Sequence, residues 1–524
     1  MVSRCFSIFI LILFLFLPNS NLFSQETTFF KVYESSLGSM SVLGYHFVDS
    51  QGRIFLSDVL RSSLISVDNS GTMDWQKRYS NILYTNIISL KDGEFGITAL
   101  GIGITSSLIY GVFDSSFNPK FLKAISLNYL RNVGLIGSAF SLMIFDKLPD
   151  GYLATLLSDE DDLAFLAKLN FDGSIRWIKR YELAEDHYLY GYPKKVSEGV
   201  YIISGGLSVS EMFSAVKFDA SGNVWFAKAY KFKNSWKFKL DWSEDIYPTP
   251  DGKYVLVGTG YDYSTGRHVA VVIKIDENGN LIFAKMIGIA GKNIDEANNI
   301  RVLPDGKLII SGFIDSAPYL IALDSQGNFL WGKKYNTGAY GGNVYSLEIV
   351  GNSITFAGSL CFYQGFSPKC GIMLAKTDLN GRIASCNIVE DFTVNVKDVT
   401  SEVEISNLPV IVRDVSFPPI SNFSLNLTNG DYYVREICSG GIVQPILERY
   451  LFLGIGGGGS VYIPELNKTY GFNNYIPWVI TVTNGTKLTL IASPSENFSY
   501  WAYECYYCGN NTTCQVEMNR DKRC

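Results

Sequence analysis

Hydrophobic and polar residues alternate along most of the chain, in short runs that turn residues separate. In Tyr319–Tyr335 one alternating run precedes an Asp-x-x-Gly turn at 324–327, and a second run carries Trp-x-Lys-x-Tyr at 331–335. Side chains alternate between the two faces of a β-strand, and a glycine-containing turn reverses the chain. This stretch therefore predicts a β-hairpin.

The hairpin recurs along the chain. Its second strand, an aromatic residue followed by x-Lys-x and a large apolar residue, occurs seven times, beginning at Phe29, Trp75, Phe121, Trp177, Phe226, Phe283 and Trp331. A second recurring hairpin, with an Asp-Gly turn, lies upstream of several copies, at 91–93, 149–151, 250–252 and 304–306. Each unit therefore predicts four short strands. A repeat of about 50 residues with four strands is typical of β-propeller blades.

The number of strand sets predicts the number of blades. Sets of three strands begin near Tyr45, Asn86, Ile144, Val196, Asp245, Asn299 and Val344. No aromatic-x-Lys-x strand follows the last set, whereas Phe29–Tyr33 is such a strand without a set before it. Pairing these two would protect both sheet edges, so we predict an all-β, seven-bladed propeller of four-stranded blades closed by the N-terminal strand. Because the second and last units are degenerate, six and eight blades remain alternatives.

Composition and the first residues predict an exported globular protein. The chain has 524 residues, 47% of them hydrophobic, and a formal net charge of only −6, which gives no broad attraction to nucleic acid. Arg4, an apolar run at Phe6–Leu17 and a small polar exit predict a signal peptide at 1–24, cleaved near Ser24. An uncleaved anchor is the alternative. We expect no transmembrane segment in the mature chain.

Export makes disulfides the expected state of the cysteines. After signal removal eight remain, at Cys361, Cys370, Cys386, Cys438, Cys505, Cys508, Cys514 and Cys524. We expect Cys386 to pair with Cys438, Cys505 with Cys514, and Cys508 with Cys524. A zinc or redox role for Cys505-x-x-Cys508 is the alternative.

The pattern changes after Cys386, which divides the mature chain into a propeller at 25–386, an extended strand-rich connector at 387–448 and a small domain at 449–524. Asn-x-Ser/Thr triplets, the acceptors for N-glycosylation, begin in the connector and occur at Asn422, Asn426, Asn467, Asn484, Asn497, Asn510 and Asn511. They predict a glycosylated surface. Chance occurrence in a Thr- and Asn-rich β segment is the alternative.

The last segment predicts a small β domain after the Gly456–Gly459 joint. Strands are expected at Ser460–Ile463, Trp478–Thr483 and Lys487–Ala492, with a further run at Gln515–Asn519. A domain of this size has a small core, so internal disulfides would stabilise it.

Two family resemblances follow from these motifs. Residues from about 28 to 386 resemble secreted bacterial and archaeal β-propeller repeat proteins, most clearly in Ile300–Tyr335 and Val255–Lys285. Residues from about 450 to 524 resemble the small bacterial repeat domain related to the listerial internalin B-repeat, through Val482–Pro494, Trp501 and the cysteine pair that follows. The first resemblance implies a fold and no particular activity. The second implies a spacer or adhesion element of an exported or surface protein.

Motifs for established chemistries are incomplete. Ser66-x-Asp68 with Gly71 and Trp75 departs from a sialidase Asp box, and no Walker loop, dinucleotide fingerprint or zinc-protease motif is present. The three histidines, His46, His187 and His268, are scattered, and we expect each to be a polar residue at a blade edge. The acidic run at 158–162 suggests a Ca²⁺ loop or, more simply, a solvated loop. We expect no cofactor, no metal and no catalytic residue.

These observations favour an exported, non-enzymatic binding or surface-structural protein, with the propeller as recognition scaffold and the C-terminal domain as spacer or attachment. The partner is unknown, with a surface protein or a glycan as candidates. The alternative is a secreted glycan-acting hydrolase or lyase, which would need carboxylates that converge at one mouth of the propeller channel.

Overall fold

The computed structural model describes residues 28–524 except for the following short segments: 36–42, 50–51, 59–60, 80–81, 102–106, 115–117, 128–139, 159–162, 184–188, 208–210, 365–366, 385, 416–419, 424–426, 430–431, 440–447, 456–458, 472–477, 484–485, 495–497, 502–504, 506–507 and 519–521. The predicted signal peptide at 1–24 lies outside the described residues. None of the described helices has both the length and the apolar character needed to cross a membrane.

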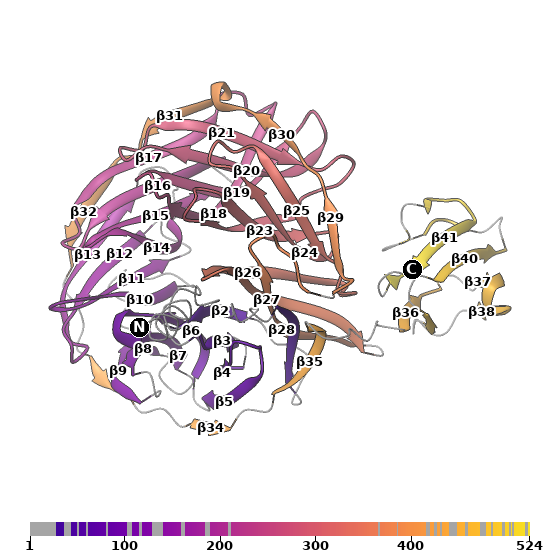
Figure 1. Cartoon of the computed structure of the whole chain (residues 1–524), viewed down its shortest axis with the longest axis horizontal. Helices are drawn as coiled ribbons and strands as arrows, with labels where there is room; N and C mark the ends of the chain where they lie inside the picture. Colours follow the sequence, from indigo (N-terminus) through magenta and orange to yellow (C-terminus); the bar gives the residue numbers. More distant parts are fainter. Residues whose placement is uncertain are drawn as a thin grey trace, which may run out of the picture.

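Seven antiparallel five-stranded sheets are built from the described residues between Phe29 and Ser439. Figure 1 shows them following one another around a common centre in a propeller-like arrangement, with the first strand of each sheet toward the inside. The first strands of sheets 1 to 7 are β2 (Leu43–Val48), β6 (Ile82–Ser89), β10 (Phe140–Leu148), β14 (Leu189–Ser197), β18 (Phe238–Pro248), β22 (Glu296–Val302) and β26 (Gly341–Val350). The seven positions at which the sequence predicts new strand sets all fall within these strands.

The next strands of each sheet follow outward in chain order. The second strands are β3 (Ile54–Asp58), β7 (Phe95–Gly101), β11 (Gly151–Ser158), β15 (Val200–Leu207), β19 (Tyr254–Asp262), β23 (Leu308–Ile314) and β27 (Ser353–Gln364). The third strands are β4 (Ser63–Val67), β8 (Ser107–Phe113), β12 (Leu163–Leu169), β16 (Met212–Asp219), β20 (Arg267–Ile275), β24 (Ala317–Leu323) and β28 (Ser367–Asp378). The fourth strands of sheets 1 to 6 are β5 (Met73–Tyr79), β9 (Pro119–Ser126), β13 (Ile175–Leu183), β17 (Val224–Phe232), β21 (Leu281–Gly288) and β25 (Phe329–Tyr335).

The fourth strand of sheet 7 comes from the other end of the chain. It is β1 (Phe29–Ser35), which pairs antiparallel with β28, from Phe29 opposite Lys376 to Tyr33 opposite Ile372. The predicted completion of the last sheet by the N-terminal strand is therefore confirmed.

A fifth strand in every sheet corrects the prediction of four. These strands come from the region expected to be a connector: β29 (Val389–Phe392), β30 (Asn395–Asp398), β31 (Val403–Asn407), β32 (Val410–Asp414), β33 (Ser421–Asn422), β34 (Leu427–Asn429) and β35 (Tyr432–Ser439). They pair antiparallel with the fourth strands of sheets 6, 5, 4, 3, 2, 1 and 7 in that order. The segment, orange in Figure 1, thus runs backwards around the outside of all seven sheets, and we call it the belt.

The Asp-x-x-Gly turns owe their shape to the aspartate side chain. In the turn at 324–327, Asp324 Oδ1 accepts hydrogen bonds from the backbone N–H groups of Gln326 and Asn328, at 2.9 and 2.8 Å. Gly327 takes a φ of +81°, a conformation that L side chains rarely adopt. The aspartate at the first position and the glycine at the fourth position therefore both specify the turn.

The recurring aromatic-x-Lys-x-aromatic strand joins one sheet to the next. The Tyr181 hydroxyl donates a hydrogen bond to the carbonyl of Gly222, in the turn of the following sheet, at 2.8 Å, and Tyr230, Tyr335 and Tyr33 do the same to Gly279, Gly381 and Gly71. These tyrosines are buried. The motif therefore packs sheet against sheet.

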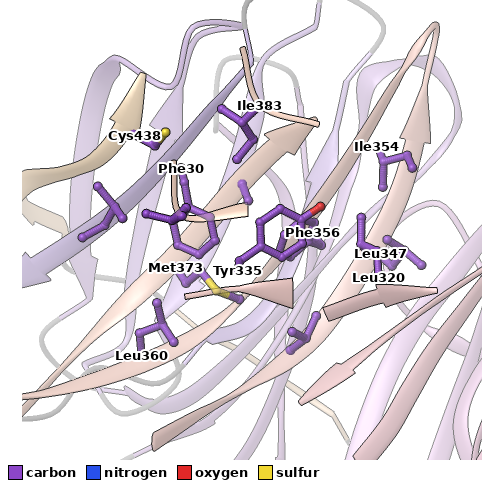
Figure 2. Close-up of a cluster of buried hydrophobic side chains, with 14 of the residues drawn as sticks. Phe30, Leu320, Tyr335, Leu347, Ile354, Phe356, Leu360, Met373, Ile383 and Cys438 are labelled. Atoms are coloured by element: carbon purple, nitrogen blue, oxygen red, sulfur yellow. The ribbon is translucent and has the colours of Figure 1, made fainter. Parts of the chain in front are cut away.

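Apolar side chains fill the spaces between neighbouring sheets. Figure 2 shows one such core, in which Phe30 from β1, Tyr335 from β25 and Phe356 from β27 lie together. The centroids of the Tyr335 and Phe356 rings are 5.0 Å apart, within the range of favourable aromatic pairs. Cys438 of the belt packs into the same core, so belt and sheets share one hydrophobic interior.

The C-terminal unit has its own core and two small sheets. One sheet contains β36 (Glu448–Leu453), β39 (Trp478–Thr483) and β42 (Lys522–Arg523), and the other β37 (Ser460–Ile463), β38 (Lys468–Gly471), β40 (Thr486–Ser493) and β41 (Thr513–Met518). The strands predicted in this region are confirmed.

All eight predicted cysteines form disulfides. Cys361 pairs with Cys370 and Cys386 with Cys438, the latter as predicted. The C-terminal pairing was wrong, because Cys505 bonds to Cys524 and Cys508 to Cys514. The reason is the parallel pairing of β42 with β36, which returns the chain end to the core that contains Cys505.

Candidate functional site

An irregularity at the inner edge of every sheet sets the position of the candidate site. Each first strand shifts register against its second strand, as at a β-bulge, between residues 43/46, 83/86, 144/146, 190/194, 243/245, 297/299 and 344/346. A bulge breaks the alternation of faces and re-aims the extra side chain. The fold therefore presents non-alternating side chains along its inner edge.

In sheets 5, 6 and 7 the extra residues are Glu244, Asn298 and Tyr345. The first strands of these three sheets lie against one another, so the three side chains belong to neighbouring elements. We call Glu244, Asn298 and Tyr345, together with Glu296 and Asn343, the bulge cluster.

Hydrogen bonds connect sheets 6 and 7 within the cluster. Asn298 Nδ2 donates to Glu296 Oε2 at 2.9 Å and to Asn343 Oδ1 at 2.7 Å, and the Asn343 amide also donates to Glu296. Among the described residues, the buried Asn298 Oδ1 has no hydrogen-bond partner. An unpaired buried acceptor costs free energy, which makes the Asn298 amide an unusual group in this strand.

Glu244 is the electrostatically unusual member of the cluster. Burial, together with the nearby carboxyl groups of Glu296 and Asp245, raises its pKa to about 7. Near neutral pH the side chain therefore exists in both protonation states and can either donate or accept a hydrogen bond. The same cluster raises the pKa of Tyr345, through burial and the Glu296 carboxyl.

A chain of ion pairs links the first strands next to the cluster. Lys194 Nζ lies 3.2 Å from Asp245 Oδ1, Arg301 Nη1 lies 2.7 Å from Asp245 Oδ2, and Arg301 Nη2 lies 2.9 Å from Glu348 Oε1. Asp245, adjacent to Glu244, is therefore neutralised by two cations. The unusual behaviour of Glu244 arises because it lacks an equivalent ion pair among the described residues.

The arrangement brings several kinds of polar group together. It offers hydroxyl, amide and carboxyl groups on three neighbouring strands, with a partly exposed Tyr345 ring. Such groups recognise hydroxyls and amines through hydrogen bonds. No group of three or more His, Cys, Asp and Glu side chains suited to a metal ion occurs among the described residues.

The histidines are not brought together where the structure describes them. His46 lies on β2, the inner edge strand of sheet 1, and is fully buried, with its Nε2 3.3 Å from Thr355 Oγ1. His268 lies on β20 of sheet 5, where its ring contacts Tyr261. His187 and the acidic residues at 159–162 lie outside the described residues.

The glycosylation candidates divide in the same way. Asn422, Asn467, Asn510 and Asn511 are exposed, the first on the belt and the others in the C-terminal unit. Asn426, Asn484 and Asn497 lie outside the described residues. The exposure of these four asparagines is compatible with glycosylation, which stays a prediction.

Sequence reasoning missed the bulge cluster, although its signal is present. Three polar residues stand together in Ser243–Ile246, and two in Ala297–Ile300, inside otherwise alternating strands. Such a break in the period of two marks a bulge. Only the arrangement of sheets, which a single sequence does not give, shows that these breaks meet at one edge.

Comparisons with known proteins show resemblance in fold. No protein-family model and no curated protein matches the chain. Virginiamycin B lyase from Staphylococcus aureus is 12% identical, with a TM-score of 0.42 over 66% of this chain and 99% of that one. Dihydro-heme d1 dehydrogenase NirN in complex with DHE is also 12% identical, with a TM-score of 0.39 over 72% and 75%. YCF48 bound to D1 peptide is 11% identical, with a TM-score of 0.36 over 66% and 95%. These β-propeller-type proteins differ in function and carry no functional argument at this level of similarity.

Proposed function

We propose that the protein is an exported recognition protein whose bulge cluster binds a hydroxyl-bearing ligand, with a glycan as the first class to test. The observation that carries the proposal is Glu244, a half-buried carboxyl group beside two other carboxyl groups. Such a placement destabilises the ionised side chain, and carboxyl groups with strongly shifted pKa values often lie in functional sites. Asn298 Oδ1, which lacks a hydrogen-bond partner among the described residues, is a second unusual group on the same inner edge of the sheets.

The proposal includes a closed ring of seven blades. Two observations at the junction of sheets 1 and 7 support closure: β2 lies against β26, and the Ser346 hydroxyl donates to the carbonyl of His46 at 3.3 Å. On the opposite side, Tyr201 and Lys195 of sheet 4 bind Asp146 of sheet 3 at 2.6 and 3.0 Å. We assign residues 25–386 with the belt at 387–448 to this ring, and 449–524 to a spacer or attachment domain.

Export is supported by the four disulfides, which persist in oxidising compartments. The signal peptide at 1–24 and the glycans at the predicted asparagines are part of the same proposal. A glycosylated, disulfide-bonded chain would act outside the cell or at its surface.

A second candidate is a glycan-acting hydrolase or lyase. It is favoured by one specific observation, the proximity of Glu244, with its pKa near neutrality, to the Glu296 carboxyl group. Glycoside hydrolysis uses two carboxyl groups, one to donate a proton and one to accept a proton or attack the sugar. The two functions differ in whether the bound glycan is released unchanged.

The test is a glycan array followed by mass spectrometry of the bound and released sugars, using residues 25–524. For the recognition function we expect saturable binding without products, weakened at least tenfold by Glu244→Gln or Asn298→Ala. Glu404→Gln, on the outer belt, is the matched control and should bind like the unmodified protein. Products that disappear in Glu244→Gln would establish the enzyme instead, and equal binding by all variants would exclude the cluster.

A further inference from the structure

A cavity between sheets 3 and 4 stands apart from the bulge cluster. Its volume is about 300 Å³, and it lies where the Asp-Gly turn at 149–151 and the beginning of β13 face the turns of sheet 4 at 198–199 and 220–221. Small-molecule sites begin at about this volume. A second cavity of about 20 Å³ lies among mostly apolar residues of the same two sheets.

The cavity coincides with a departure from the repeat. In other sheets the first aromatic residue of the recurring strand packs on the turn glycine of the next sheet: a methyl group on Gly279 would lie 2.9 Å from the Phe226 ring, and one on Gly381 would lie 2.8 Å from Trp331. At the equivalent Gly222 the nearest atoms belong to Lys179 and Tyr181, and the Trp177 ring comes no closer than 3.4 Å. Trp177 lines the cavity instead.

The polar groups in the wall are held in fixed positions. The Asp150 carboxylate accepts hydrogen bonds from Lys168 Nζ at 2.5 Å and from Arg176 Nη1 at 2.6 Å, through its two different oxygens. Arg176 Nη2 also donates to the Asp150 carbonyl at 2.9 Å. Lys168 is buried. The hydrogen bonds of Lys168 and Arg176 hold the pKa of Asp150 below its usual value, so this group stays ionised.

The charges of the wall balance. Two cations, Lys168 and Arg176, face two anions, Asp150 and Glu198, which gives a formal net charge of zero. Glu198 is itself paired with Lys91 and Lys195, at 2.9 and 3.0 Å. An anionic ligand would have to displace Asp150 from both of its cations, whereas a neutral polyol can add hydrogen bonds to groups that stay in place.

We propose that this cavity is a second binding site, for one neutral pyranose unit, with Trp177 as the surface on which the sugar ring lies. The C–H face of a pyranose packs on an aromatic ring, and its hydroxyls can both donate and accept hydrogen bonds, as the mixed wall of Asp150, Arg176 and Ser221 requires. The inference uses none of the residues of the bulge cluster. It therefore stands or falls separately from the proposed function.

The test is titration of the full mature chain with methyl α-D-glucopyranoside, methyl α-D-mannopyranoside, methyl β-D-galactopyranoside and N-acetylglucosamine, followed by tryptophan fluorescence and by calorimetry. We expect at least one sugar to bind in the millimolar range and to change the fluorescence. Trp177→Phe should abolish the fluorescence change, and Trp177→Ala should weaken binding at least tenfold. Trp331→Phe, in the equivalent position of sheet 6, is the control and should retain both signals.

Two further measurements keep the inference falsifiable. If thermal unfolding shows that the Trp177 variants are unstable, Arg176→Met takes their place in the test. This substitution removes the charge from an exposed side chain and should weaken sugar binding. Glu404→Gln, on the outer belt, should leave both sugar binding and the fluorescence change unchanged. Failure of all four sugars to bind, or a response that Trp177→Phe retains, would overturn the proposal. Calorimetric binding of inorganic phosphate in place of the sugars would show an anion site and would overturn it as well.

Discussion

At the scale of a single residue, the environment of Glu244 links the stability of the fold to pH. Its position at a bulge, half-buried between Asp245 and Glu296, raises its pKa from 4.5 to about 7. The folded state therefore retains a proton that the unfolded chain releases between these two values. The stability that this group contributes is complete below pH 4.5 and is lost as the pH rises through 7.

Glu244→Gln should consequently stabilise the protein in alkaline solution. The variant keeps the shape and removes the titration, so at pH 8 its free energy of unfolding should exceed that of the unmodified protein by about 2 kcal/mol, allowing for partial exposure. At pH 4 the two should be equal. Urea denaturation at both pH values measures the difference, and equal stability at pH 8 would contradict the assigned environment of Glu244.

At the scale of elements, the belt covers the outer edges of the sheets. The fourth strand of each sheet would otherwise present an open edge, which is prone to pairing with other chains. The belt pairs with all seven, and a disulfide joins Cys386, just before the belt, to Cys438 in its last strand, across a separation of 52 residues. Belt and disulfide together therefore close a covalent loop around the outer strands.

Removal of this disulfide should loosen the belt before the sheets. Replacing Cys386 and Cys438 by serine should lower the free energy of unfolding by about 4 kcal/mol, because a loop of this length loses much entropy on closure. Limited proteolysis should then cut first within 387–438. The control is Cys361→Ser with Cys370→Ser. The disulfide that these substitutions remove spans a sequence separation of only 9, so its loss should have a smaller effect. Equal losses from both pairs would contradict the role assigned to the belt.

Local pattern predicted the elements that repeat and failed for those that do not. The Asp-x-x-Gly turns, the aromatic-x-Lys-x strand and the role of Phe29–Tyr33 follow from residues that act within one hairpin or recur in each unit. The belt strands are two to eight residues long and have no recurring motif, and only their partners define them. The bulge cluster was missed for the same reason, since Glu244 and Asn298 meet only after the sheets are arranged.

For the whole molecule, the junction between the first and last sheets is the place where two distant parts of the chain meet. His46 of sheet 1 is fully buried there, within hydrogen-bond distance of Thr355 of sheet 7, and the charges of Glu348 and Arg301 act on its imidazole. Burial, opposed by Glu348 and assisted by Arg301, lowers the pKa of His46 from 6.5 to about 4. The junction is therefore built around a neutral imidazole.

Acid should weaken this junction. Because the folded pKa is depressed, the contribution of neutral His46 is complete above pH 6.5 and is lost as the pH falls to about 4, by up to about 3 kcal/mol. His46→Gln should remove this part of the pH dependence. Thermal unfolding from pH 7 to pH 4 measures it, and an unchanged slope in the variant would show that other groups govern the acid response.

The closed belt also decides how the molecule responds to force. A pull on the C-terminal unit enters the sheets at β35, where the bond from Cys438 to Cys386 transfers the tension directly to the start of the belt. The strands between the two cysteines then bear little load. With the bond reduced, the same pull would detach the belt strands one at a time, from β35 to β34 and onward. Formation of the disulfide therefore changes sequential detachment of the belt strands into joint resistance of the whole belt.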